Sequence, residues 1–368
     1  MGETLTGPLS KKTRRRGGEM SRIRLLPSGR EVECPDGETV LSALEKAGYA
    51  LPNNCRAGAC GECKVKVTSG QFDQGMVLDM ALSQAERKDG FGLMCMAKPL
   101  SELLEIEWGT DDAKPKLFPP RENMLFVVVD KFPRTPRITE FVLKPVGKPM
   151  RFWPGQYLVL GDESRGVPPR CYSIANAPKP DGEINLHITR VDDGATSRWL
   201  HDSVKVGDFI KVSGAYGTFI GDPSVDTPVL CLAAGSGLAP IMSLADAALR
   251  RGYNQPVTLV FSGKTKEDIY CQGSMALWQA RNRRFRFVPT LTQEKHDGLM
   301  GRIPAVLPGL FQDLSNHSIF IAGSPDFVEA CVTAVKALGA KADQIHSEGY
   351  FPQHKPEQPP ADRLAPVV

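Results

Sequence analysis

The stretch Cys55-Arg56-Ala57-Gly58-Ala59-Cys60-Gly61-Glu62-Cys63 decides what the first third of this chain folds around. Its cysteines have the spacing C-x4-C-x2-C, and a fourth, Cys95, follows downstream. This is the plant-type spacing of thiolates that hold a [2Fe–2S] cluster. The small residues between the thiols let the main chain come close to the cluster, whose sulfides accept hydrogen bonds from backbone amides. The sequence therefore predicts that Cys55, Cys60, Cys63 and Cys95 bind a [2Fe–2S] cluster.

Two alternatives compete with the cluster. A zinc site usually shows paired cysteines about two to four residues apart. Unrelated free thiols would seldom gather so closely in a glycine-rich loop. The five isolated cysteines are expected to be small buried hydrophobic residues: Cys34, Cys171, Cys231, Cys271 and Cys331. Nine cysteines without a secretory signal favour reduced thiols in the cytoplasm.

Length and charge limit the other possibilities. A chain of 368 residues is expected to hold two or three domains. Lys and Arg number 45 against 42 Asp and Glu, and residues 1–20 alone hold five of the basic and two of the acidic residues. The remaining residues are therefore charge-balanced, which argues against a nucleic-acid-binding protein. No apolar run approaches the length of a membrane span.

Composition divides the chain into six segments. They are a basic tail at 1–20, a cluster-binding domain at 21–110, a linker at 111–122, a strand-rich domain at 123–221, a domain at 222–352 and a proline-rich tail at 353–368. Short strand-like runs in the second domain predict an antiparallel barrel: 124–129, 138–143, 157–160, 171–175, 184–189 and 209–212. The third domain alternates strands with helices, which predicts a parallel sheet.

Three short motifs lie in the strand-rich domain. Arg170-Cys171-Tyr172-Ser173 begins a predicted strand, and it offers a guanidinium that can grip phosphate and a phenol ring that can stack. Gly194-Ala195-Thr196-Ser197 follows another strand, and Gly214-Ala215-Tyr216-Gly217-Thr218-Phe219 closes the domain. The third domain opens with Gly235-Ser236-Gly237 between a strand and a helix, where backbone amides suit a dinucleotide diphosphate.

In this order, over about residues 22–352, the motifs resemble the ferredoxin–NAD(P)H reductase superfamily, in the oxygenase-reductase type. The resemblance implies a multidomain α+β and α/β protein, with a β-grasp ferredoxin domain, a six-stranded antiparallel flavin barrel and a parallel-sheet nucleotide domain. It implies that Arg170 pairs with a flavin phosphate, that Tyr172 stacks on the isoalloxazine and that Ser173 hydrogen-bonds the ring. Further cofactor contacts are expected from Gly194, Ser197, Gly214, Gly217 and Thr218. FAD is expected rather than FMN, because the Gly194 turn would otherwise lack a pyrophosphate.

The predicted nucleotide-binding residues resemble those of the family, but two positions differ. The resemblance implies nucleotide contacts from Gly235, Ser236, Gly237, Lys264 and Gly323. Relatives commonly have arginine where this chain has Lys264, and cysteine where it has Ala322. Glu348-Gly349-Tyr350 matches the family's acidic-x-aromatic element near the flavin.

Three such sites in one chain predict an order of electron flow. NAD(P)H gives up a hydride, an iron–sulfur cluster accepts one electron at a time, and a flavin bridges the two. Such hydride transfer needs alignment and a dry contact, so no side chain is assigned as a catalytic base. We predict an NAD(P)H-dependent reductase that feeds a ferredoxin or a terminal oxygenase in aromatic-compound degradation.

Two points stay open at the level of sequence. The departures at the nucleotide site also fit a redox-sensing regulator that uses NAD(P)H poorly and controls catabolic genes through a transcriptional partner. Glu267 and Asp268 would repel a 2′-phosphate, while Lys264 and Lys266 could attract one, which leaves a mild preference for NADH.

Overall fold

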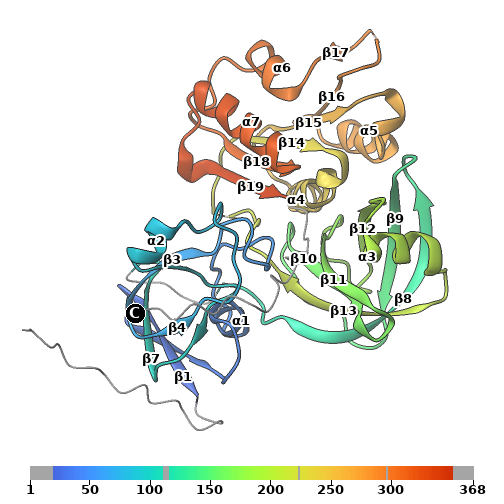
Figure 1. Cartoon of the computed structure of the whole chain (residues 1–368). Helices are drawn as coiled ribbons and strands as arrows, with labels where there is room; N and C mark the ends of the chain where they lie inside the picture. Colours follow the sequence, from blue (N-terminus) through green and yellow to red (C-terminus); the bar gives the residue numbers. More distant parts are fainter. Residues whose placement is uncertain (1–19, 111–115, 223, 296, 351–368) are drawn as a thin grey trace, which may run out of the picture.

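The computed structural model of this chain describes residues 20–110, 116–222, 224–295 and 297–350. The predicted basic tail up to residue 19, the proline-rich tail and part of the predicted linker lie outside these ranges. Figure 1 shows three bodies around a common junction, with the nucleotide-type sheet above the other two. Among the described residues, no helix is long and apolar enough to span a membrane.

The first body is a small mixed sheet with one helix packed on it. Its strands run in the order β2-β1-β7-β3-β5, and only β1 and β7 are parallel. Thr39 begins the helix α1, because its hydroxyl accepts a hydrogen bond from the Ser42 amide at 3.3 Å. Leu41 and Leu44 of α1 are buried in the core. The elements are β1 Ser21–Leu26, β2 Arg30–Cys34, α1 Val40–Lys46, β3 Lys64–Ser69, β4 Phe72–Asp73, α2 Gln84–Lys88, β5 Phe91–Leu93, β6 Lys98–Pro99 and β7 Leu103–Glu107.

The second body is a curled sheet of six antiparallel strands in the order β11-β10-β13-β8-β9-β12. An isolated bridge between Ile174 and Leu186 joins its two edges, so the sheet nearly closes into a barrel. Alternate residues point inward, and Phe126, Phe141 and Leu158 fill the interior. The elements are β8 Arg121–Pro133, β9 Ile138–Pro145, β10 Tyr157–Asp162, η1 Glu163–Arg165, β11 Val167–Ser173, β12 Ile184–Thr189, α3 Ala195–Arg198, η2 Trp199–Ser203 and β13 Phe209–Tyr216.

The third body is a parallel sheet in the order β17-β16-β15-β14-β18-β19. Helices α4 and α5 cover one face and α6 and α7 the other. The strand order reverses between β14 and β18, which marks the edge where such sheets bind ligands. The elements are β14 Val229–Ala234, η3 Gly235–Gly237, α4 Leu238–Arg250, β15 Val257–Gly263, η4 Lys266–Asp268, α5 Gln272–Arg281, β16 Phe285–Leu291, β17 Leu299–Met300, α6 Ile303–Leu310, β18 Ser318–Gly323, α7 Pro325–Ala337, η5 Ala342–Gln344 and β19 Ile345–Gly349.

The predicted fold class is confirmed. One strand differs in position: the run predicted at 171–175 begins earlier, at Val167, and ends at Ser173. The cause is Ile174, which leaves β11 and pairs with Leu186 across the opening of the barrel. The boundaries of the six predicted segments remain predictions.

Candidate functional site

The four cysteines of the first body come together as two pairs. Hydrogen bonds join the thiols of Cys55 and Cys60, and those of Cys63 and Cys95. The amides of Ala57 and Ala59 point at the Cys55 sulfur at 3.4 and 3.3 Å, and the Cys95 amide points at Cys63 Sγ at 3.4 Å. Two pairs of thiols surrounded by amide donors suit two irons with bridging sulfides.

Each pair contains one thiol with a lowered pKa, Cys55 or Cys63, and one with a raised pKa, Cys60 or Cys95. The neighbouring Cys60 thiol and the amides of Ala57 and Ala59 lower the pKa of Cys55 to about 5, against the opposing effect of burial. A thiolate is the form that binds a metal. The residues present therefore fit a [2Fe–2S] cluster, and Cys55, Cys60, Cys63 and Cys95 are its proposed ligands.

A single zinc ion fits these thiols less well. Zinc–sulfur bonds of about 2.3 Å in a tetrahedron would place all four sulfurs about 3.8 Å apart. Over the described ranges, the one group of three ligand atoms within 4.8 Å of each other is Glu140, His187 and Cys271, which lies elsewhere. The arrangement in two pairs therefore favours the two-iron cluster.

The loop that carries the thiols needs glycine at Gly58. This residue has a φ of 68°, and a Cβ there would lie 2.9 Å from the carbonyl oxygen of Met76. A side chain would thus be strained and would push the segment after β4 off the loop. The small residues in the motif serve close packing as well as backbone approach.

The predicted flavin strand meets the end of the third body. Ser173, at the end of β11, donates a hydrogen bond to Glu348 Oε1 at 2.7 Å, and its hydroxyl lies 3.3 Å from the Tyr350 hydroxyl. Glu348 Oε2 is buried, and no residue in the part of the chain that the structure describes forms a hydrogen bond with it. A buried carboxyl oxygen without a partner fits a site that is completed by a polar group of a bound ring.

Burial changes the acidity of that carboxyl group. Glu348 is 5% exposed, and burial raises its pKa to about 7, although the hydrogen bond from Ser173 opposes the rise. The group therefore gains or loses a proton near neutral pH. Glu348, Tyr350 and Ser173 thus form one polar cluster at the predicted flavin position, as the family resemblance implies.

The other predicted flavin residues lie along the barrel. Tyr172 packs partly against the barrel core, and Arg170 is half-buried on the same strand. The Ser197 hydroxyl accepts from the Val191 amide at 3.1 Å and donates to Gly194 O at 3.1 Å. Ser197 therefore shapes the turn, and any contact of this turn with a pyrophosphate is left to its backbone amides.

The end of β13 packs on Tyr157 of β10. Gly217 has a φ of 92°, and a Cβ there would lie 2.7 Å from the Tyr157 ring. Gly214, within β13, likewise has no room for a Cβ, because the Leu158 side chain of β10 lies against it. Thr218 follows and lines a cavity beside β19. Gly214 and Gly217 thus let β13 pack closely on β10 within the barrel, and the flavin contacts proposed for them and for Thr218 remain proposals.

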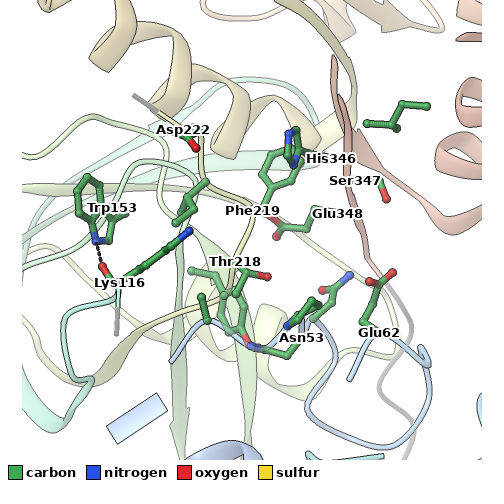
Figure 2. A pocket seen from close by; sticks show the side chains of 18 residues that line it. Asn53, Glu62, Lys116, Trp153, Thr218, Phe219, Asp222, His346, Ser347 and Glu348 are labelled. Atoms are coloured by element: carbon green, nitrogen blue, oxygen red, sulfur yellow. Dashed lines mark hydrogen bonds between the residues drawn. The ribbon is translucent and has the colours of Figure 1, made fainter. Parts of the chain in front are cut away.

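That cavity lies where all three bodies meet. It has a volume of about 650 Å³. Figure 2 shows Asn53 and Glu62 from the first body, Thr218 from the barrel and His346 and Glu348 from β19 around it. Residues of all three bodies therefore border one cavity.

The nucleotide residues gather at the edge where the strand order reverses. Gly235, Ser236 and Gly237 follow β14, while Gly323 ends β18 and pairs with Gly349 of β19. The Gly323 carbonyl accepts a hydrogen bond from the Tyr350 amide at 2.9 Å. Across the gap to the barrel, Thr189 donates a hydrogen bond to the Ser236 hydroxyl at 3.0 Å. The glycine turn is thereby held against the end of β12, while Gly323 is held against the end of β19.

Gly237 has no room for a side chain. Its Cβ would collide with the Ala322 carbonyl and lie 2.9 Å from the Gly323 amide. We expect Gly237→Ala to destabilise the protein by about 1–3 kcal/mol through overpacking and to slow reduction by NADH. Gly273→Ala, in an open position of α5, is the matched control and should change stability by no more than about 1 kcal/mol. Thermal unfolding of both variants checks this, and equal melting temperatures would contradict it.

The two departures from the family lie at the same edge. Lys264 follows β15, and its amide donates to Asp268 Oδ2 at 2.9 Å, so the backbone there is fixed by the acidic turn. Ala322 is fully buried in β18 and carries no thiol toward the junction. The structure thus accommodates both substitutions without distortion of the sheet.

A second cluster joins the barrel to the third body. The Tyr270 hydroxyl lies 3.2 Å from His187 Nδ1, and Arg134 donates to Glu140 Oε2 at 2.6 Å. Burial lowers the pKa of His187 to about 4 and raises that of Cys271 to about 12, so both are uncharged at neutral pH. Because Arg134 already neutralises Glu140, we assign this cluster to the contact between the two bodies and not to a metal.

Sequence reasoning missed the residues that join the first body to the others. Asn53 accepts a hydrogen bond from Tyr157, Asn54 donates one to Gly349 O, and Arg56 lies over the Tyr216 ring. One signal was present in the sequence, because Arg56 and Glu62 are the two large charged residues in a loop of otherwise small ones.

Comparisons with known proteins agree with this architecture. Three family descriptions match in order: "2Fe-2S iron-sulfur cluster binding domain" at residues 23–100, "Oxidoreductase FAD-binding domain" at 130–220 and "Oxidoreductase NAD-binding domain" at 231–333. The chain is 34% identical over 331 residues to the reductase subunit of an aromatic O-demethylase from Amycolatopsis sp., covering 88% of this chain and 97% of the relative. It is 31% identical over 319 residues to the phenol 2-monooxygenase reductase component DmpP of Pseudomonas sp., covering 85% and 89%.

Solved structures show the same likeness. The Amycolatopsis cytochrome P450 reductase GcoB superimposes with a TM-score of 0.82 at 31% identity, over 91% of this chain and 100% of that one. The ferredoxin reductase in carbazole 1,9a-dioxygenase gives 0.73 at 25% identity, over 92% and 100%. The predicted family and the predicted reductase function are therefore confirmed. This chain belongs to the ferredoxin–NAD(P)H reductase superfamily, in the type that joins an N-terminal [2Fe–2S] domain to FAD and NAD(P) domains, and it is an NAD(P)H-dependent electron-transfer iron–sulfur flavoprotein.

Proposed function

We propose that this protein draws electrons from NADH and passes them singly to an oxygenase that acts on an aromatic compound. The observation that carries the proposal is the junction at which Ser173, Glu348 and the cluster loop meet. Relatives named as reductase components of an aromatic O-demethylase, a phenol 2-monooxygenase and a terephthalate 1,2-dioxygenase support an aromatic substrate downstream.

The residues of this chain divide the work between binding and orientation. A bound FAD would supply the exchange between hydride and single electrons. Arg170 and the backbone of the Gly194 turn would hold its phosphates, Tyr172 would pack on its ring, and Ser173 would hydrogen-bond the polar edge. Gly235, Ser236 and Gly237 would hold the nucleotide diphosphate at the start of α4. Gly214, Gly217 and Thr218 would shape the barrel end, while Lys264 and Gly323 would border the nucleotide.

Glu348 would bind and release a proton and would not carry electrons. Its pKa of about 7 lets it hold a proton beside Ser173 at mildly acidic pH and lose it at higher pH. Glu348 lines the cavity between the three bodies, and burial of its carboxyl group is the cause of the raised pKa. The side chains at this junction would thus provide hydrogen bonds and a site for a proton, and none is needed as a nucleophile.

A preference for NADH is supported by the charges after β15. Asp268 caps the turn through its contacts with the Lys264 and Thr265 amides. Lys266 Nζ lies 3.5 Å from Glu294 Oε1, so this lysine has a carboxylate partner. With Glu267 nearby, the turn offers little net positive charge to a 2′-phosphate.

The nucleotide preference is measured from kcat/KM for NADH and NADPH. We expect NADH to be favoured in the unaltered protein, and Glu294→Gln to improve NADPH use by roughly threefold, because it frees Lys266. Glu329→Gln, an exposed carboxylate on α7, is the control and should leave the ratio unchanged. A higher kcat/KM for NADPH in the unaltered protein would reverse the assignment.

The location and the partner follow from the same chemistry. The nine cysteines are free thiols, and NADH is an intracellular reductant, which supports a cytoplasmic location. A separate ferredoxin is the other acceptor class that a one-electron donor serves. The comparisons give no support to a transcriptional regulator as partner.

One experiment tests the function as a whole. The purified holoprotein is mixed anaerobically with NADH, and absorption by flavin and by cluster is followed. Bleaching of the flavin and then of the cluster supports the proposal. A holoprotein that contains both groups and is not bleached within minutes would overturn it.

A further inference from the structure

Four consecutive residues of the first body, 53–56, touch both of the other bodies; we name them the cluster arm. The Tyr157 hydroxyl on β10 donates a hydrogen bond to Asn53 Oδ1 at 2.8 Å. Asn54 Nδ2 donates to the Gly349 carbonyl at the end of β19 at 2.5 Å. The arm therefore contacts the barrel and the nucleotide domain within two residues of chain.

Arg56 is the most firmly fixed member of the arm. Its Nη1 lies 2.7 Å from both carboxylate oxygens of Glu45, and the two side chains are only 22% and 3% exposed. The same guanidinium lies 4.2 Å from the centre of the Tyr216 ring at the end of β13. Arg56 thus links the core of the first body to the barrel with one rigid group.

The backbone of Arg56 has an unfavourable conformation that its surroundings must stabilise. Its φ of 53° is in the left-handed region, which residues other than glycine seldom adopt. A largely buried ion pair adds little net stability, so its main effect is to fix geometry. In this conformation the Arg56 side chain contacts both Glu45 and Tyr216.

The arm contains one cluster ligand and abuts the flavin residues. Cys55 lies between Asn54 and Arg56, and Gly349 lies between Glu348 and Tyr350, which both contact Ser173. A few contacts therefore set the separation between the proposed cluster and flavin sites. Loss of a contact of the arm would leave that separation less well fixed.

We infer that Arg56 is a positioning residue for electron transfer from flavin to cluster, acting through its contact with Tyr216. The inference rests on the proposed function. In this step one electron leaves the reduced flavin and enters the oxidised cluster, no bond forms or breaks, and the hydride of the nucleotide is the source. Arg56 itself neither gains nor loses an electron or a proton.

The test uses holoprotein with two variants that disrupt the contact from opposite sides. Arg56→Gln removes the charge, and Tyr216→Leu removes the ring while leaving the pair with Glu45. Arg24→Gln is the matched control, because Arg24 pairs with Glu31 on the same body at 2.7 Å and touches no other body in the described contacts. After anaerobic mixing with NADH, the rate of cluster reduction is divided by the rate of flavin reduction.

We expect this ratio to fall about tenfold in Arg56→Gln and Tyr216→Leu and to stay at the unaltered value in Arg24→Gln. Unchanged ratios in Tyr216→Leu protein with full iron and sulfide content would overturn the inference. The same holds if Arg56→Gln loses its cluster while Tyr216→Leu transfers electrons normally, since Arg56 would then only support its own domain. If NADH does not reduce the flavin at all, the proposed function fails, and photoreduction of the flavin still measures the second step.

A readout on cofactor-free protein separates contact from activity. Hydrogen exchange at the amides of 53–56 and 345–349 is compared among the same variants. We expect faster exchange in Arg56→Gln and Tyr216→Leu and no change in Arg24→Gln. Protection that is equal in all of them would show that the arm does not depend on Tyr216 and would count against the inference.

Discussion

Cys63→Ala is expected to produce a flavoprotein without iron or acid-labile sulfide. Cys63 pairs with Cys95, so its loss leaves one iron with a single protein thiolate. NADH should still reduce the flavin and, through it, a small acceptor such as ferricyanide. Reduction of cytochrome c, a protein acceptor that depends on the cluster, should fall to the background rate. Metal and sulfide analysis together with the two dye assays measures this outcome.

The matched control for Cys63→Ala is Cys34→Ala. Cys34 is fully buried in the same body, its sulfur lies 3.6 Å from the Glu38 carbonyl oxygen, and it is not one of the four proposed ligands. Its replacement should cost roughly 1–2 kcal/mol of stability and leave about two irons per chain. If Cys63→Ala instead kept its iron and sulfide, the assigned ligand set would be wrong.

Glu348→Gln is expected to change how stability depends on pH. The unfolded carboxyl ionises near 4.5, whereas in the folded protein burial raises its pKa to about 7. The folded state therefore holds an extra proton between these values, and this group's contribution to stability falls as pH rises from about 4.5 to 7. The total change is roughly 3 kcal/mol. Glutamine cannot ionise and should remove this part of the pH dependence.

Denaturant unfolding of flavin-free protein from about pH 5 to about pH 8 measures the effect of Glu348→Gln. Relative to the unaltered protein, the variant should gain stability as the pH rises. Glu329→Gln, at an exposed position, should follow the unaltered protein throughout. Parallel curves for Glu348→Gln and the unaltered protein would show that Glu348 is ionised in the folded state across this range.

The features that could be predicted are those carried by neighbouring residues. Cys55, Cys60 and Cys63 lie in one loop, and the turn at Gly235 lies between its own strand and helix, so spacing alone was informative. The strand runs of the barrel were found because alternation is a local property. The alternation of strands and helices did not give the bounds of elements with weak patterns, such as α5, where Met275 is the one buried residue among those described.

The contacts that join the bodies could not be derived from local pattern. Tyr157 and Asn53 are 104 residues apart, and Asn54 and Gly349 are 295 apart. No periodicity connects such positions, and their meeting depends on how three finished bodies pack. Glu348 was found only through the family resemblance, and its unpartnered Oε2 became visible only with the structure.

The hydrogen bond from Ser173 to Glu348 also bears on how the protein matures in the cell. Its two residues are separated by 175 positions of chain, and Glu348 lies on the edge strand β19. At ribosomal speeds of about 5–20 residues per second, β19 emerges roughly 10–35 s after β11. The barrel can thus fold well before β19, which carries Glu348 to the proposed flavin site, has been synthesised. Stable capture of the coenzyme is therefore expected to be a late event of biosynthesis.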